Sequence, residues 1–177
     1  MRFSGPCAAW IPLPTPEVDP RVAAETALTP RGIVFRTARL ADLNRHSVDL
    51  AADYGVTVRR ATNTHGRADP EGRTITCSAV TDDATYAVFL HELAHVVDPA
   101  ADSRQFPHHV SDTSLIAVGG ELGAWNWAVD HAKVWTKPMQ EKMHASLLSY
   151  RQHATPAEVG EMAALLVSAS LRVAPNP

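Results

Sequence analysis

The residues with the clearest chemical potential are the two histidines and the glutamate of the segment HELAH at positions 91–95. His91 and His95 are one helical turn apart, so both imidazoles project from one face and can reach a single cation. Glu92 is rotated by about 100° from His91, where it can hold a water molecule instead of binding the cation. Zn²⁺ takes His nitrogens at about 2.0–2.1 Å and keeps one position for water in catalytic sites. The segment therefore predicts a zinc site with Glu92 as a general base.

The motif is specific for a chain of this composition. With 9 His in 177 residues, chance produces HExxH about 0.02 times per chain. Apolar residues surround the three polar ones and could bury the rest of the helix. They are Leu90, Leu93, Val96 and Val97.

A third ligand has to come from another segment. The metzincin spacing is not met, because Asp98 and Ala101 stand where that pattern has Gly and its third ligand. His108 and His109 lie in a proline-containing loop and could return to the metal. Glu121 begins a predicted helix further along, and its carboxylate would complete the His₂Glu set of thermolysin-like enzymes. Glu121 is the preferred ligand, with the two loop histidines as alternatives.

Neighbouring residues suggest supporting roles. Ala124 and Ala128 share the helical face of Glu121, and their small side chains would let this helix approach the HELAH helix closely. Asp98 lies on the face of the two histidines and could accept an imidazole N–H. The residues expected in the core are Trp125, Trp127 and Trp135. The candidates for stabilising an oxyanion are Tyr86, His108, His109 and Tyr150.

The pattern of apolar residues and caps predicts the elements that position these side chains. Helices are expected over 37–54, 84–98, 115–135, 138–152 and 156–173. Gly55 would end the first, Thr81, Asp82 and Asp83 offer N-caps to the second, and Gly119 and Gly120 could delay the third. Short strands are expected at 56–58 and 73–80, separated by a turn over 63–72. Residues 1–32 hold six prolines, which predicts an extended arm.

These elements predict an α+β fold that is mostly helical, with a small β-sheet packed beside the HExxH helix. Three regions are expected. Residues 1–32 form the proline-rich arm, 33–137 the catalytic core, and 138–177 two C-terminal helices that pack on the core.

The composition of the chain excludes several classes of protein from the expectation. Lys and Arg total 16 against 19 Asp and Glu, a net charge of -3, so nucleic-acid binding is not expected. No run of about 18 apolar residues predicts a membrane span, and prolines interrupt the apolar stretch that a signal peptide would need. Cys7 and Cys77 are too few for a disulfide framework. A cytoplasmic protein with reduced thiols is therefore expected, and its oligomeric state is left open.

Four segments in this order resemble the ImmA/IrrE-type metallopeptidases: ADYGVTVRR, RTITCSAV, FLHELAHVVD and GGELGAWNWA. The stretch ELGAW is also similar to the metallopeptidase domain of ArdC-type antirestriction proteins. The resemblance covers residues 38–135. It implies a minimal zincin of the gluzincin type, with Glu121 as the third zinc ligand.

The resemblance also implies an activity. A zinc-activated water, with Glu92 as its general base, would hydrolyse a peptide bond in a protein or peptide substrate, and a single regulatory protein is one such target. The alternative is a non-catalytic zinc-binding interaction module, regulatory or antirestriction-like, with the same fold.

Overall fold

The computed structural model describes residues 30–62, 66–106, 109–110 and 115–174. The chain divides into two compact units, Met1–Thr37 and Ala38–Pro177, and the residues discussed below lie in the second. The longer elements are α2 (Pro30–Asp53), β1 (Thr57–Arg60), β2 (Arg67–Asp69), β3 (Thr74–Cys77), α3 (Asp83–Val97), α4 (Val118–His131), α5 (Lys137–Tyr150) and α6 (Pro156–Ser170). The shorter ones are the 3₁₀ turns η1 (Pro99–Ala101), η2 (Ser103–Gln105) and η3 (Arg151–His153), and the strands β4 (His109–Val110) and β5 (Leu115–Ile116).

The helix ends follow local capping chemistry. At the start of α3 the Asp82 carboxylate accepts the Thr85 N–H at 2.7 Å, while the Thr85 hydroxyl accepts the Asp82 N–H at 3.0 Å. Thr155 and Glu158 form the same reciprocal pair at the start of α6. Gly55 follows α2 with a φ of 64°, which glycine adopts without strain. The predicted caps are therefore confirmed.

The predicted boundary of the N-terminal arm is wrong at its end. The arm was expected to reach residue 32 and the helix to begin at 37, but α2 begins at Pro30. Proline is tolerated in a first helical turn, where its missing N–H would have no partner. The rest of the expected arm, residues 1–29, lies outside the described residues.

The sheet has three strands in the order β1-β3-β2, with β1 parallel and β2 antiparallel to β3. The strand β2 was not predicted, because its residues were assigned to a turn. In register across the sheet, Val58, Ile75 and Ala68 form one row on the face that joins the core. The next row, Arg59, Thr76 and Arg67, lies on the opposite face because side chains alternate along a strand.

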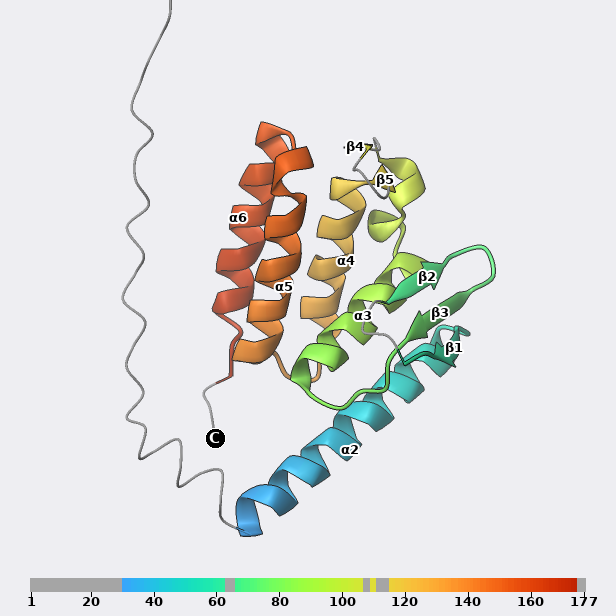
Figure 1. Ribbon diagram of the computed structural model, residues 1–177, viewed down its shortest axis with the longest axis vertical. Coiled ribbons are helices and arrows are strands. Elements are labelled where there is room, and N and C mark those ends of the chain that lie inside the picture. Colours follow the sequence, from blue (N-terminus) through green and yellow to red (C-terminus); the bar gives the residue numbers. More distant parts are fainter. Residues whose placement is uncertain (1–29, 63–65, 107–108, 111–114, 175–177) are drawn as a thin grey trace, which may run out of the picture. The chain divides into compact units, whose positions relative to one another are not determined.

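Helix α3 is the central element of the second unit. It packs on β2 and β3 on one side and on α4 and α5 on another (Figure 1). Its core residues are Tyr86, Ala87, Phe89, Leu90, Leu93 and Ala94, all fully buried. The sheet and the later helices therefore hold α3 between them, in the mostly helical α+β arrangement that the sequence predicted.

Polar contacts fix the first turn of α3. The Asp83 carboxylate accepts hydrogen bonds from Arg39 of α2 at 2.8 Å and from Thr136, just before α5, at 2.7 Å. The Tyr86 hydroxyl accepts the Lys133 N–H at 3.0 Å and lies 2.8 Å from His46 Nδ1. The buried hydroxyl of Tyr86 is fully engaged by these two partners, so this residue is wrong as a candidate for stabilising an oxyanion.

Glycines let α4 approach η1 and η2. The helix was expected from residue 115 but starts at Val118, because Leu115 and Ile116 form β5, and it contains Gly119 and Gly120 in its first turn. A Cβ at Gly123 would overlap the Ala100 carbonyl oxygen, and one at Gly120 would press on the Ser103 backbone. Glycine weakens a helix, but Gly120 and Gly123 occur in α4 because the backbone of η1 and η2 leaves no room for a side chain at these positions.

We expect Gly123→Ala to destabilise the fold by about 1–3 kcal/mol, because the added methyl group meets backbone that cannot rotate away. Gly160→Ala in α6 is the matched control. Nothing lies within 4 Å of its Cβ position, so alanine there should stabilise the helix by about 0.5–1 kcal/mol. Urea unfolding of both variants measures the difference, and an equal response of the two would contradict the close contact.

The remaining predictions for the core are confirmed where they can be observed. Trp125, Trp127 and Trp135 are buried at 1%, 6% and 3% exposure. Cys77 is a buried free thiol, and Cys7 lies outside the described residues. In the part of the chain that is described, no helix is both long and apolar enough to cross a bilayer.

Candidate metal centre

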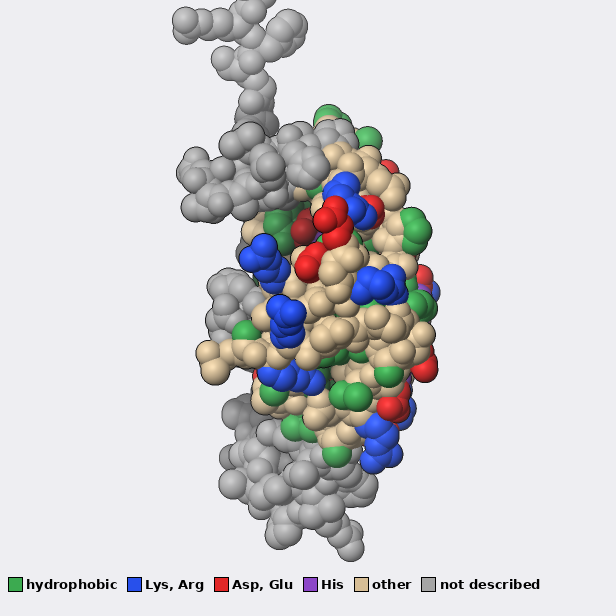
Figure 2. All heavy atoms as spheres, turned by 90° about the vertical axis from the view of Figure 1, so that its right-hand side faces the viewer, with side chains coloured by type: hydrophobic (Ala, Val, Ile, Leu, Met, Phe, Trp, Pro, Cys, Tyr) green, Lys and Arg blue, Asp and Glu red, His purple; other side chains and the backbone are tan. Residues whose placement is uncertain are grey.

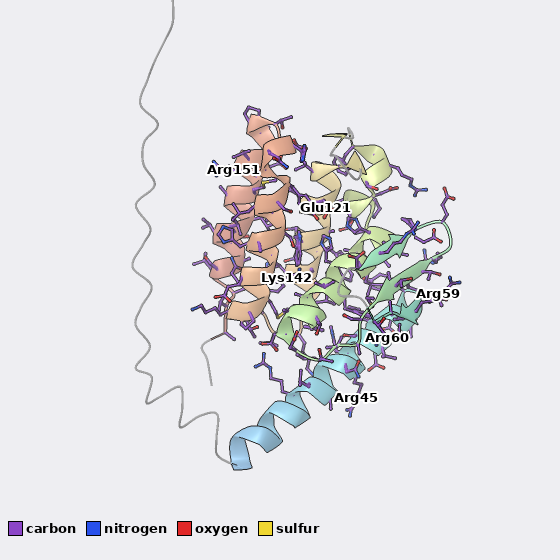
Figure 3. The ribbon with its side chains drawn as sticks, viewed as in Figure 1. Arg45, Arg59, Arg60, Glu121, Lys142 and Arg151 are labelled. Carbon is purple, nitrogen blue, oxygen red and sulfur yellow. The ribbon has the colours of Figure 1, made fainter. Side chains whose placement is uncertain are left out.

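Three side chains from two helices converge on one point. His91 and His95 lie one turn apart on α3. Glu121, labelled in Figure 3, lies in the first turn of α4. One ligand atom from each lies within 4.8 Å of the other two. The two Nε2 atoms are 3.3 Å apart, and the Glu121 oxygens lie 3.1 Å from His91 Nε2 and 3.7 Å from His95 Nε2. The packing of α3 on α4 thus brings together the three residues that the sequence analysis singled out as ligands.

A main-chain group orients His95. Its Nδ1 lies 2.8 Å from the Ala101 carbonyl oxygen of η1, which can only accept, so Nδ1 carries the proton and Nε2 presents its lone pair. Burial lowers the pKa of His95, and the nearby His91 lowers it further. Glu121 acts to raise this pKa, but its effect is smaller, so the pKa lies below its ordinary value. The imidazole is therefore held neutral, the form that ligates a metal.

The role expected for Asp98 is wrong in its detail. The Asp98 carboxylate accepts the Ala100 N–H at 2.9 Å, and the Asp98 carbonyl accepts the Ala101 N–H at 3.0 Å. Asp98 therefore caps η1 and fixes the turn that presents Ala101 to His95. The acid supports the imidazole through the backbone and does not bind it directly.

His91 is held by aromatic packing. Its ring stacks on the Trp125 indole with centroids 4.3 Å apart and an interplanar angle of 30°. It meets the His95 ring edge to face, at 84°. His91 is 6% exposed, and its Nδ1 has no hydrogen-bond partner among the described residues. The stack restricts the ring to an orientation in which Nε2 faces the other two ligand atoms.

Glu121 is a half-buried carboxylate with incomplete hydrogen bonding. Its Oε2 atom has no hydrogen-bond partner among the described residues, although His91 Nε2 lies 3.1 Å away. Burial works to raise the pKa of Glu121, but the neighbouring His91, His95 and Tyr150 hydroxyl together bring it below its ordinary value. The small residues Ala124 and Ala128 on the same helix are fully buried, as expected for a close approach to α3.

Glu92 lies beside these three residues without joining them. Burial, opposed by His91 and assisted by Glu121, raises the pKa of Glu92 to about 7. Gly66, immediately before β2, lies directly over the Glu92 side chain, where any Cβ would overlap it. The end of the sheet thus packs on Glu92 and restricts where its carboxylate can go.

Tyr150, at the end of α5, is the candidate hydroxyl that the structure does bring to this centre. Burial raises the pKa of Tyr150, and the carboxylates of Glu121 and Glu92 raise it further. The phenol is therefore protonated and faces both carboxylates. His108 and the side chain of His109, the alternative ligands, lie outside what the structure describes.

The donor set fits a zinc ion. Two imidazole nitrogens and one carboxylate are the ligands of a catalytic His₂Glu site, and one coordination position remains for water. An unpartnered carboxylate oxygen buried beside two imidazole nitrogens is costly without a cation to satisfy it. Neither the Trp125 stack nor the Ala101 carbonyl contact could be predicted from the residue pattern, because both arise from packing.

Comparison with known proteins adds no relative: no family model matches the chain, and neither the curated proteins nor the solved structures include a match.

Proposed function

We propose that the protein is a zinc-dependent metallopeptidase with a minimal zincin fold. The observation that carries this proposal is the convergence of His91, His95 and Glu121 within 4.8 Å, next to the separate, half-buried carboxylate of Glu92 on α3. A purely structural metal site has no use for a non-ligating acid at that place. Glu92 is therefore the feature that favours hydrolysis over a non-catalytic zinc module.

The residues of this centre would have separate roles in peptide hydrolysis. His91, His95 and Glu121 would hold the metal, which when bound polarises the peptide carbonyl and makes water a nucleophile near neutral pH. Glu92 accepts a proton from the attacking water on a carboxylate oxygen and then donates it to the leaving amine nitrogen. The Tyr150 hydroxyl can donate a hydrogen bond toward charge that develops at the carbonyl oxygen.

An extended peptide fits the free edge of β2. Among the described strands, only β3 pairs with β2, so the opposite edge keeps backbone groups available for pairing. This strand begins beside Gly66, which lies on Glu92. A peptide that adds to β2 as a further strand would pass the metal ligands with its backbone fixed by hydrogen bonds.

Metal analysis tests the proposal most directly. We expect the purified full-length protein to retain one zinc per chain after dialysis and to lose peptide hydrolysis when a chelator removes it. Readdition of zinc should restore hydrolysis. Plasma mass spectrometry measures the stoichiometry, and absence of bound metal after incubation with zinc would contradict both the peptidase and the zinc-module alternative. Retention of zinc without hydrolysis of any peptide would favour the non-catalytic module.

A further inference from the structure

The open face of the sheet carries arginines with no acidic partner. Arg59 and Arg67 flank Thr76 in one row across the three strands, and both are exposed. No described carboxylate forms an ion pair with either guanidinium, unlike Arg39, Arg104 and Arg172. Figure 2 looks onto the side of the molecule that carries the sheet and shows separate Lys and Arg side chains exposed there.

Arg67 differs from Arg59 in its position relative to the proposed substrate. Arg67 is the first residue of β2 and follows Gly66, which lies over the Glu92 side chain. Arg59 lies on β1, at the other edge of the sheet, as Figure 3 shows. Two strand spacings separate them, about 10 Å. Only Arg67 adjoins the edge along which a peptide would be held.

The acidic residues near β2 contact groups other than Arg67. Asp69, on the same face of the strand, accepts the Gly72 N–H at 3.0 Å. Glu71, in the following turn, lies 3.4 Å from Arg104, which also pairs with Asp102 at 2.9 Å. These contacts leave Arg67 as the unpaired charge on this strand in the described part of the chain.

We propose that Arg67 selects peptide substrates with Asp or Glu at the position opposite it on the strand that pairs with β2. The inference rests on the proposed peptidase function and names the substrate class. Directly opposed side chains of paired strands lie about 4.5–5.5 Å apart at Cβ, close enough for a guanidinium to contact a carboxylate. Alternation along the strand confines the preference to a position whose side chain points away from α3.

The experiment compares cleavage by the zinc-loaded full-length protein and three variants, two at position 67 and one at position 59. A tryptic digest of a bacterial proteome is cleaved and the sites are identified by mass spectrometry. Synthetic peptides based on the best site then carry Glu, Gln or Lys at the enriched position. We expect kcat/KM to favour Glu over Gln by about two- to fivefold, the range of a cross-strand charge pair.

Arg67→Glu should reverse the preference toward Lys, and Arg67→Gln should remove it without reversing it. Arg59→Glu makes the same charge change on the same face and should leave it intact. Absence of an acidic preference, its persistence in Arg67→Glu, or equal loss in Arg59→Glu would each overturn the inference while leaving the peptidase proposal standing. If the zinc-loaded protein cleaves no peptide at all, the proposed function fails, and this inference fails with it.

Discussion

Replacing Glu92 by glutamine is expected to lower kcat/KM for peptide hydrolysis about 10²- to 10⁴-fold, the usual contribution of a general base. The amide has nearly the same shape as the carboxylate but cannot accept the proton of the attacking water. Zinc content should stay at one ion per chain, because Glu92 is not among the three converging ligand residues. The loss of activity would then be separated from any loss of metal.

Two measurements on the same preparations check this result. Peptide cleavage gives the rate, and plasma mass spectrometry gives the zinc content. Glu161→Gln, an exposed position of α6, controls for the change of charge and should behave as the unaltered protein. Hydrolysis by Glu92→Gln at an undiminished rate, with zinc bound, would remove Glu92 from the mechanism.

Glu121→Gln is expected to weaken zinc binding by more than about 100-fold. Loss of groups that merely orient a ligand costs about 10–100-fold in affinity, and Glu121 would be a ligand itself. Thermal stability should respond as well. Zinc at 100 times its Kd stabilises a protein by about 2.7 kcal/mol, so the Tm of the unaltered protein should rise with zinc while that of the variant should not.

A competing chelator titration measures the affinity. The double variant with His108→Ala and His109→Ala is the informative control, because these histidines were the alternative third ligands. It should bind zinc as tightly as the unaltered protein. If Glu121→Gln binds zinc tightly and the double variant binds it weakly, the third ligand is a histidine of the loop and not Glu121.

The helices and the local part of the site were predictable because their causes are local. The caps at Asp82 and Thr155 involve residues three positions apart, and the HELAH spacing places both imidazoles on one face of any helix. Glu121 could be proposed only from residue type and spacing. Its 3.1 Å approach to His91 depends on how α4 packs on α3.

The predictions that failed involve long-range or main-chain contacts. The strand β2 consists of three residues within a turn-like segment, and it exists as a strand through pairing with β3. Gly119 and Gly120 weaken a helix when read alone, but contacts with Phe106 and Ser103 require their small size. Asp98 was expected to bind the imidazole because its carboxylate can be identified from the sequence. The group that contacts His95 Nδ1 is instead the main-chain carbonyl of Ala101, and every residue carries such a carbonyl.

The backbone acceptor of His95 has an evolutionary consequence. Because the Ala101 oxygen belongs to the main chain, no single substitution at position 101 deletes it, and the buried position requires only that the side chain stay small. The tautomer of His95 therefore depends on the conformation of the main chain at this turn. Insertions, deletions or a redirecting proline between 98 and 102 are the changes that could disable it, as is loss of the Asp98 carboxylate that caps the turn.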